Sequence, residues 1–152
     1  MKHRFLRCAA LPLLVLVITA TSAPRTYAQS SRSLYERLGG YDAISAVVDD
    51  FAESLFTDPK VGKFFVGMSA DSRESFKQKN KNLMCNVTGG PCKVISRPAK
   101  TAHAGLGITE ADFNVVAQHL TDTLNKFKVP SAEQAEVMKI IGSLKPDIVE
   151  KR

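Results

Sequence analysis

The sequence predicts an all-α domain. Apolar residues recur at intervals of three and four in four long stretches, the spacing that puts them on one face of a helix. Glycine and proline separate these stretches, and no alternating strand pattern, internal repeat or low-complexity tract predicts another architecture. Helices with one apolar face must bury it, so the four helices are expected to pack as two pairs.

The first 28 residues resemble a secretory signal peptide. A basic start is followed by an apolar run from Cys8 to Ala20 and by the small-x-small sequence Thr26-Tyr27-Ala28, after which cleavage is expected. The run is shorter than the roughly 20 residues that span a membrane and contains Pro12, so an uncleaved anchor is the lesser alternative. We expect export, to a bacterial periplasm or into the medium, with no stable membrane insertion after cleavage.

Removal of residues 1–28 leaves 124 of the 152 residues and takes away four basic residues but no acid, so the net charge falls from +6 to +2. The basic character therefore belongs to the leader and does not indicate a nucleic-acid partner. The polar residues 29–32 are expected to be loose, and residues 33–152 have the length of one domain.

Two cysteines, Cys85 and Cys92, remain in the exported chain. An even number of cysteines in an oxidising compartment predicts a disulfide. Six residues lie between them, which is not the CxxC spacing of a redox pair, and two cysteines without clustered histidines make a poor zinc site.

The first half of the domain contains two long helices. A short helix over 33–38 should end at Gly39-Gly40, and the next helix should end near Asp58. Phe64 and Phe65 follow in a short apolar turn, where they could fill the core or cover something large and flat. The apolar face of the first long helix consists of Ile44, Val47, Val48, Phe51 and Leu55.

The second long helix should begin at a cap provided by Ser69 or Asp71 and end at Gly89-Gly90-Pro91. Asn80 interrupts its apolar face, so its amide needs a hydrogen-bond partner in the backbone, in water or in a ligand. The other members of that face are Phe76, Leu83, Met84 and Val87.

Of the three histidines, only His103 is placed to serve as a buried ligand. His3 lies in the leader, and His119 falls off the apolar face of its helix. A neutral imidazole commonly binds a transition metal or haem iron, although a lone histidine near a helix end can equally be a cap or a surface residue. Gly105 and Gly107 should end the His103 segment after little more than one turn.

Two further helices follow. Thr109 should cap the first, and the capping-box pattern from Ser131 to Gln134 should begin the second, which is predicted to run unbroken to Ile148. Its buried face would consist of Val137, Ile140, Ile141, Leu144 and Ile148.

Several short sequences together resemble those of group I truncated haemoglobins over residues 33–148. They are Leu34-Tyr35-Glu36-Arg37-Leu38-Gly39-Gly40, Phe64-Phe65, Gly89-Gly90-Pro91, Ala102-His103-Ala104-Gly105-Leu106-Gly107, Phe113 and His119-Leu120. The resemblance implies a two-over-two helical sandwich around a b-type haem. The haem should be bound non-covalently, because the chain contains no CxxCH sequence.

The resemblance also implies site residues. His103 would be the proximal iron ligand, and Arg97 and Lys100 would meet the haem propionates or else form a solvated basic pair. The haem would lie against Phe65 and other pocket-lining side chains, namely Phe51, Val116, Leu120 and Ile141, with Phe76 and Asn80 facing the bound ligand.

The sequence departs from the family at the distal side. Ala52 stands where many members have a tyrosine, and Asn80 where glutamine is common, so tight oxygen retention is in doubt. Lys79 is a candidate sixth iron ligand, but only as the neutral amine, since an ammonium group has no lone pair.

The leading functional hypothesis is a haem protein that binds oxygen, nitric oxide or carbon monoxide. A nitric oxide dioxygenase would need tight oxygen binding and an electron donor, and a peroxidase-like enzyme would need a distal acid/base group. A haem-free helical interaction module would make His103 incidental. The sequence identifies neither an electron donor nor an oligomeric state.

Overall fold

The computed structural model describes residues 32–151. The predicted signal peptide and residues 29–31 of the loose segment lie outside this range. The helices are α1 (Leu34–Arg37), α2 (Gly40–Thr57), the short 3-10 helix η1 (Gly62–Phe65), α3 (Ala70–Val87), α4 (Ala99–His103), α5 (Glu110–Lys126), α6 (Ser131–Ser143) and α7 (Lys145–Ile148).

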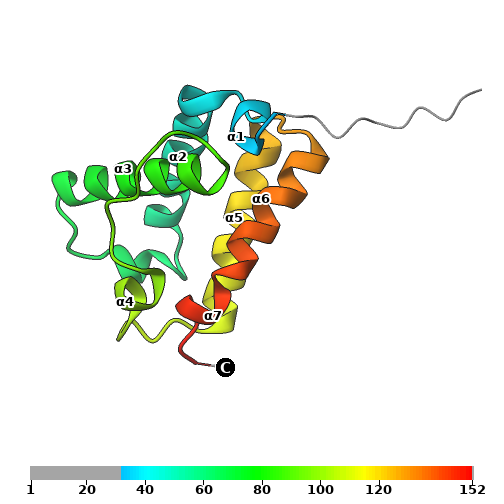
Figure 1. Ribbon diagram of the computed structural model, residues 1–152. Helices are drawn as coiled ribbons and strands as arrows, with labels where there is room; N and C mark the ends of the chain where they lie inside the picture. Colours follow the sequence, from blue (N-terminus) through cyan, green and yellow to red (C-terminus); the bar gives the residue numbers. More distant parts are fainter. Residues whose placement is uncertain (1–31, 152) are drawn as a thin grey trace, which may run out of the picture.

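The four long helices form two pairs, as the apolar periodicity predicts. Helix α2 packs against α3, α5 packs against α6, and α2 also contacts α5 (Figure 1). The short helix α4, which ends at His103, contacts α7 near the C-terminus. Residues 32–151 form helices and no strand, so the all-α prediction is confirmed. No helix in this range is long and apolar enough to cross a membrane.

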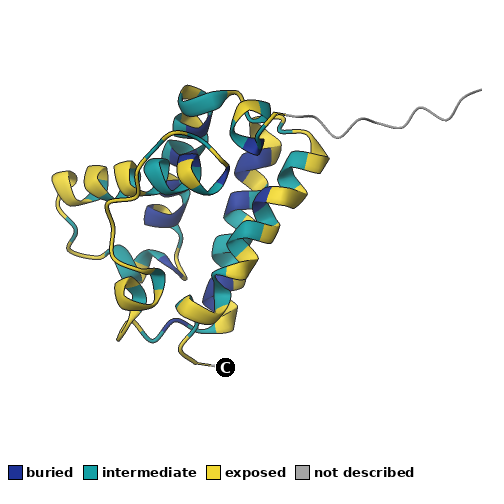
Figure 2. Ribbon diagram, in the orientation of Figure 1, coloured by how far each residue is buried: buried dark blue, intermediate teal, exposed yellow. Residues whose placement is uncertain are grey.

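The core lies where α2, α5 and α6 face one another (Figure 2). Leu34, Leu120, Leu124 and Val137 form one buried cluster, because α1, α5 and α6 turn their apolar faces inward there. Helix α3 contributes a single buried residue, Cys85, and α4 contributes none. Phe76, Leu83 and Met84 of the apolar face of α3 border the cavity described below, and Met84 also packs against the core cluster.

Two of the predicted caps are present. The side chain of Ser69, not Asp71, accepts a hydrogen bond from the backbone of Ser72 at 3.2 Å. Thr109 and Asp112 form a reciprocal capping box at the start of α5. These caps satisfy backbone N–H groups that have no partner within their own helices.

The prediction of one final helix over 131–148 is wrong. The helix ends at Ser143 and restarts as α7, whose second residue is Pro146. Proline has no N–H to bond one turn back, and its ring clashes with the carbonyl there, so the helix cannot continue through it.

The capping box at Ser131 is also wrong. The residue that precedes α6 is Pro130, and Ser131 makes no side-chain cap. Gln134 does not reach back to the helix start; its amide donates to the carbonyl oxygen of Val129 at 2.8 Å and to Asn125 at 3.0 Å. Those contacts fasten α6 to the end of α5.

The predicted disulfide between Cys85 and Cys92 is present and joins the last turn of α3 to the loop that follows it. The turn between them passes so close to α1 that Gly90 has no room for a side chain. A Cβ there would lie 2.5 Å from the Tyr35 ring and 2.7 Å from the carbonyl oxygen of Cys85. Neither cysteine lines the cavity.

Candidate functional site

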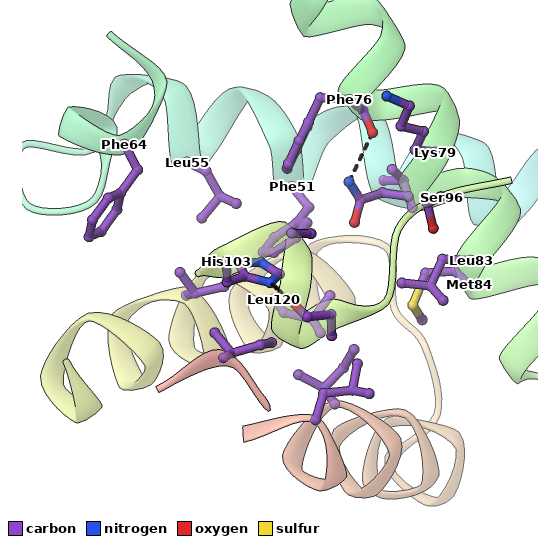
Figure 3. A pocket seen from close by; sticks show the side chains of 18 of the residues that line it. Phe51, Leu55, Phe64, Phe76, Lys79, Leu83, Met84, Ser96, His103 and Leu120 are labelled. Atoms are coloured by element: carbon purple, nitrogen blue, oxygen red, sulfur yellow. Dashed lines mark hydrogen bonds between the residues drawn. The ribbon is translucent and has the colours of Figure 1, made fainter. Parts of the chain in front are cut away.

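A cavity of about 1340 Å³ lies between the two helix pairs. Typical small-molecule pockets have volumes of about 300–1,000 Å³, so this cavity suits a large ligand. Its walls come from α2, η1, α3, the 94–98 loop and helices α4 to α7, and most of the lining side chains are apolar. Figure 3 shows Phe76 and Lys79 on α3 across the cavity from Leu120, with His103 between them in this view.

His103 is the last residue of α4 and its half-buried ring lines the cavity. Its Nδ1 lies 2.7 Å from the carbonyl oxygen of Ala99, one turn earlier. A carbonyl oxygen can only accept, so Nδ1 carries the hydrogen, and in the neutral ring Nε2 then has the lone pair. Nε2 makes no hydrogen bond to any residue from 32 to 151. The ring is thus held in the tautomer that can bind a metal ion through Nε2.

Nearly all of the predicted site residues come together around this cavity. The residues that line it with His103 are Phe51, Phe65, Phe76, Lys79, Asn80, Arg97, Val116, Leu120 and Ile141. Lys100 is the exception, because it lies exposed on α4 outside the lining. Their contacts with a haem group remain predictions.

The distal wall carries an aromatic cluster that the sequence analysis missed in part. The ring centroids of Phe56 and Phe65 lie 5.1 Å apart, those of Phe65 and Phe76 5.3 Å, and those of Phe56 and Phe76 5.6 Å. Phe56 lies off the apolar face of α2, so helical periodicity does not single it out. Phe56 does not line the cavity, whereas Phe65 and Phe76 do. Its ring therefore packs behind the two rings that face the cavity.

Ala52 is fully buried, with 0% of its surface exposed, and does not line the cavity. Its methyl group is too short to extend past the helix that carries it. Helix α2 therefore presents no hydroxyl group to the distal side at this position.

Asn80 finds its hydrogen-bond partner in the backbone. Its Nδ2 donates to the carbonyl oxygen of Phe76 at 2.9 Å. An amide nitrogen carries two hydrogens, so one N–H and the Oδ1 acceptor remain, and neither bonds to another described residue. The backbone contact fixes the amide at the cavity wall.

Lys77, Lys79 and Lys81, at every second position of α3, have different surroundings. Lys77 pairs with Glu53 at 2.6 Å and Lys81 pairs with Asp49 at 2.8 Å, and both acids belong to α2. Lys79 lies between them, lines the cavity and has no ion-pair partner among residues 32–151. Of these three lysines, it is the one that borders the cavity without an ion-pair partner in the described part of the chain.

His119 faces away from the cavity, as predicted, and bonds to Asp58. Its Nε2 lies 2.8 Å from Asp58 Oδ2. Backbone N–H groups of Val61 and Lys60 also donate to this carboxylate, at 2.9 and 2.7 Å. The Val61 hydrogen bond, followed by the one from His119, lowers the pKa of Asp58 to about 2. This cluster fastens the end of α2 to α5.

The chain matches the family model described as bacterial-like globin over residues 33–150. It is 34% identical over 116 residues to a group 1 truncated hemoglobin of Mycolicibacterium paratuberculosis. That alignment covers 76% of this chain and 83% of the relative. It is 30% identical over 115 residues to a group 1 truncated hemoglobin of Synechocystis, which covers 73% of this chain and 90% of the relative.

Solved structures are similar as well. A mutant of the truncated hemoglobin from Tetrahymena pyriformis, in the Fe(III) form, superposes with a TM-score of 0.72 at 25% identity, covering 78% of this chain and 98% of the other. The 2/2 hemoglobin from a Synechococcus species, in the cyanomet state with covalently attached heme, superposes with a TM-score of 0.70 at 31% identity and the same coverage.

Proposed function

Because the chain belongs to the bacterial-like globin family, as a group I truncated globin, we propose that it binds haem through His103 and uses it to bind diatomic gases. The family implies the haem cofactor. The observation that supports His103 as the ligand is its hydrogen bond to Ala99, which leaves the Nε2 lone pair free at the cavity wall.

The donor set of the cavity fits haem better than a bare metal ion. Residues 32–151 contain no group of three or more histidine, cysteine, aspartate or glutamate side chains that could hold a metal. A single imidazole suffices when the macrocycle supplies the other ligands, and apolar walls suit its faces. When bound, haem would supply an iron coordination position at which oxygen, nitric oxide or carbon monoxide binds.

The chain's own residues would then set how a gas is held. Phe65 and Phe76 close the distal side with apolar surface and exclude water, because Phe56 buttresses both rings. Asn80 would donate its remaining N–H to a bound gas, and no hydroxyl group from position 52 would add to it. We therefore infer weaker oxygen retention than a distal tyrosine would give.

We propose that the haem is of b type and held non-covalently. The chain lacks a CxxCH sequence, and the second histidine among the described residues, His119, is engaged by Asp58 away from the cavity. Arg97 at the cavity and Lys100 on exposed α4 are the proposed partners of the propionates.

We also propose that the protein is exported and works in a periplasm. The leader-like residues 1–28 and the Cys85–Cys92 disulfide both support this proposal, since disulfides persist in oxidising compartments.

The proposed function is tested by adding haem to the apoprotein and recording the absorption spectrum of the ferric and dithionite-reduced forms. A stoichiometric haem band that shifts when carbon monoxide is added supports it. No band after haem is supplied would contradict it and leave a helical interaction module as the better reading.

A further inference from the structure

The carboxylate of Glu150, near the C-terminus, accepts two hydrogen bonds from the turn that follows His103. Its Oε1 accepts a hydrogen bond from the backbone N–H of Gly105 at 2.6 Å, and its Oε2 accepts one from Gly107 at 2.5 Å. Both glycines have left-handed backbones, with φ of +82° and +65°. This conformation, which glycine adopts without steric cost, lets both N–H groups point toward the same carboxylate.

The backbone around Glu150 strengthens this contact. The N–H groups of Glu150 and Lys151 both donate to the carbonyl oxygen of Ile108, at 2.9 and 3.2 Å, and Glu110 donates back to Lys151 at 3.3 Å. Thr109 and Lys151 form an isolated parallel bridge. The C-terminal segment is thus bound along the whole connection between α4 and α5, and helix α7 contacts α4 at the same end of the molecule (Figure 1).

The connection matters because α4 has little support of its own. The helix has five residues, and the residue that precedes it, Pro98, provides no side-chain cap. His103 is its last residue and lies two positions before Gly105, so the turn at Gly105 directly follows the end of the helix that carries the imidazole ring. Helices this short are not stable in isolation and depend on tertiary contacts.

We propose that Glu150 is a positioning residue for His103. It does not touch the cavity; it holds the Gly105–Gly107 turn so that His103 Nε2 keeps its direction. The inference rests on the proposed function for its consequence, since the group that gains from a fixed imidazole is the haem iron. The contact itself is a property of the chain without any ligand.

The test compares Glu150→Ala and Glu150→Gln with Asp147→Asn. Asp147 is an exposed acid of the same C-terminal segment whose side chain has no bonding partner among residues 32–151, so it is a matched control for charge and location. The rate of haem transfer to excess apomyoglobin and the iron–histidine stretching band of the ferrous protein are recorded for each. The first reports loss of the cofactor, and the second reports the geometry of the imidazole.

We expect Glu150→Ala to release haem about tenfold faster, equal to about 1.4 kcal/mol, and to shift or broaden the stretching band. Glu150→Gln should lie in between, because its amide oxygen can accept one of the two hydrogen bonds, and Asp147→Asn should match the wild type. Glu150 variants that match the wild type in both readouts would overturn the proposal.

Amide hydrogen exchange in the apoprotein separates this proposal from the proposed function. Glu150→Ala and Glu150→Gln should speed exchange at Gly105 and Gly107 whether or not haem is present. If exchange speeds up while haem release and the stretching band stay unchanged, the contact is only structural and the positioning role is wrong. If the wild type takes up no haem, the proposed function fails, and with it the role of the contact.

Discussion

The side-chain amide of Asn80 donates to the carbonyl oxygen of Phe76, 2.9 Å away and one turn earlier in α3. This bond fixes the amide at the cavity wall and leaves one of its N–H groups without a partner among the described residues. Because Ala52 is buried behind the lining, α2 supplies no second donor. A gas ligand on the distal side would therefore meet the amide of Asn80 without a second donor from position 52.

Adding the missing hydroxyl group should strengthen oxygen binding. Ala52→Tyr should slow oxygen dissociation about two- to tenfold relative to Ala52→Phe, since one hydrogen bond contributes about 0.5–1.5 kcal/mol. Both variants introduce the same ring, so the comparison isolates the hydroxyl group. Stopped-flow measurement of oxygen release gives the rates, and equal rates in the two variants would contradict the account of the distal side.

Lys79 should close on the iron when the amine is neutral and no gas is present. We expect the ferric spectrum of the wild type without added ligand to show low-spin character, and Lys79→Met to lack it. Lys77→Met is the matched control, because Lys77 is paired with Glu53 and does not line the cavity. A purely high-spin spectrum of the ferric wild type would rule out the closure.

The Asp58 cluster should make stability depend on pH. The pKa of Asp58 in the folded protein is about 2, below the ordinary value of about 3.9. The stabilisation that the Asp58 carboxylate provides is therefore present above about pH 4 and is lost as the pH falls toward 2. Asp58→Ala should lower the urea midpoint at neutral pH, and the difference from wild type should shrink below pH 4. Asp58→Asn should lose less stability than Asp58→Ala, because the side-chain carbonyl oxygen of asparagine can still accept hydrogen bonds from the N–H groups of Lys60 and Val61. A pH-independent difference would contradict this assignment.

Reduction of the Cys85–Cys92 bridge should destabilise the protein by about 2–3 kcal/mol. The bridged cysteines are 7 positions apart, and closing so short a loop restricts the unfolded chain only modestly. Urea unfolding with and without dithiothreitol measures the effect. The Cys85→Ser/Cys92→Ser double variant should unfold like the reduced wild type and ignore the reductant; stability that reductant does not change in the wild type would count against the bridge.

The helices were predictable because their signals are local. Apolar spacing located α2, α3, α5 and α6, and the glycines located the ends of α1 and α4. The break at Leu144 was missed although Pro146 signals it, because the apolar stripe continues from Ile141 to Ile148 on both sides of the break. A covalent constraint on the backbone prevailed over side-chain periodicity.

The site was predictable only in part. Spacing put Phe76 and Asn80 on one face, and the family resemblance supplied the roles that spacing cannot. Phe56 was missed because it lies off the apolar face of its own helix, α2. Glu150 was missed because the glycines that it contacts are 45 and 43 positions away in the sequence. Helix geometry alone also does not reveal that Lys77 finds an acid on α2, while Lys79 has no ion-pair partner in the described part of the chain.

The central claim is that His103 Nε2 binds haem iron. The most direct test is the absorption spectrum of haem-loaded His103→Gly, ferric and reduced with carbon monoxide, before and after free imidazole is added, beside His119→Ala. We predict that the haem band weakens or shifts in His103→Gly, that imidazole restores it, and that His119→Ala matches the wild type. A His103→Gly spectrum identical to that of the wild type without imidazole would contradict the claim.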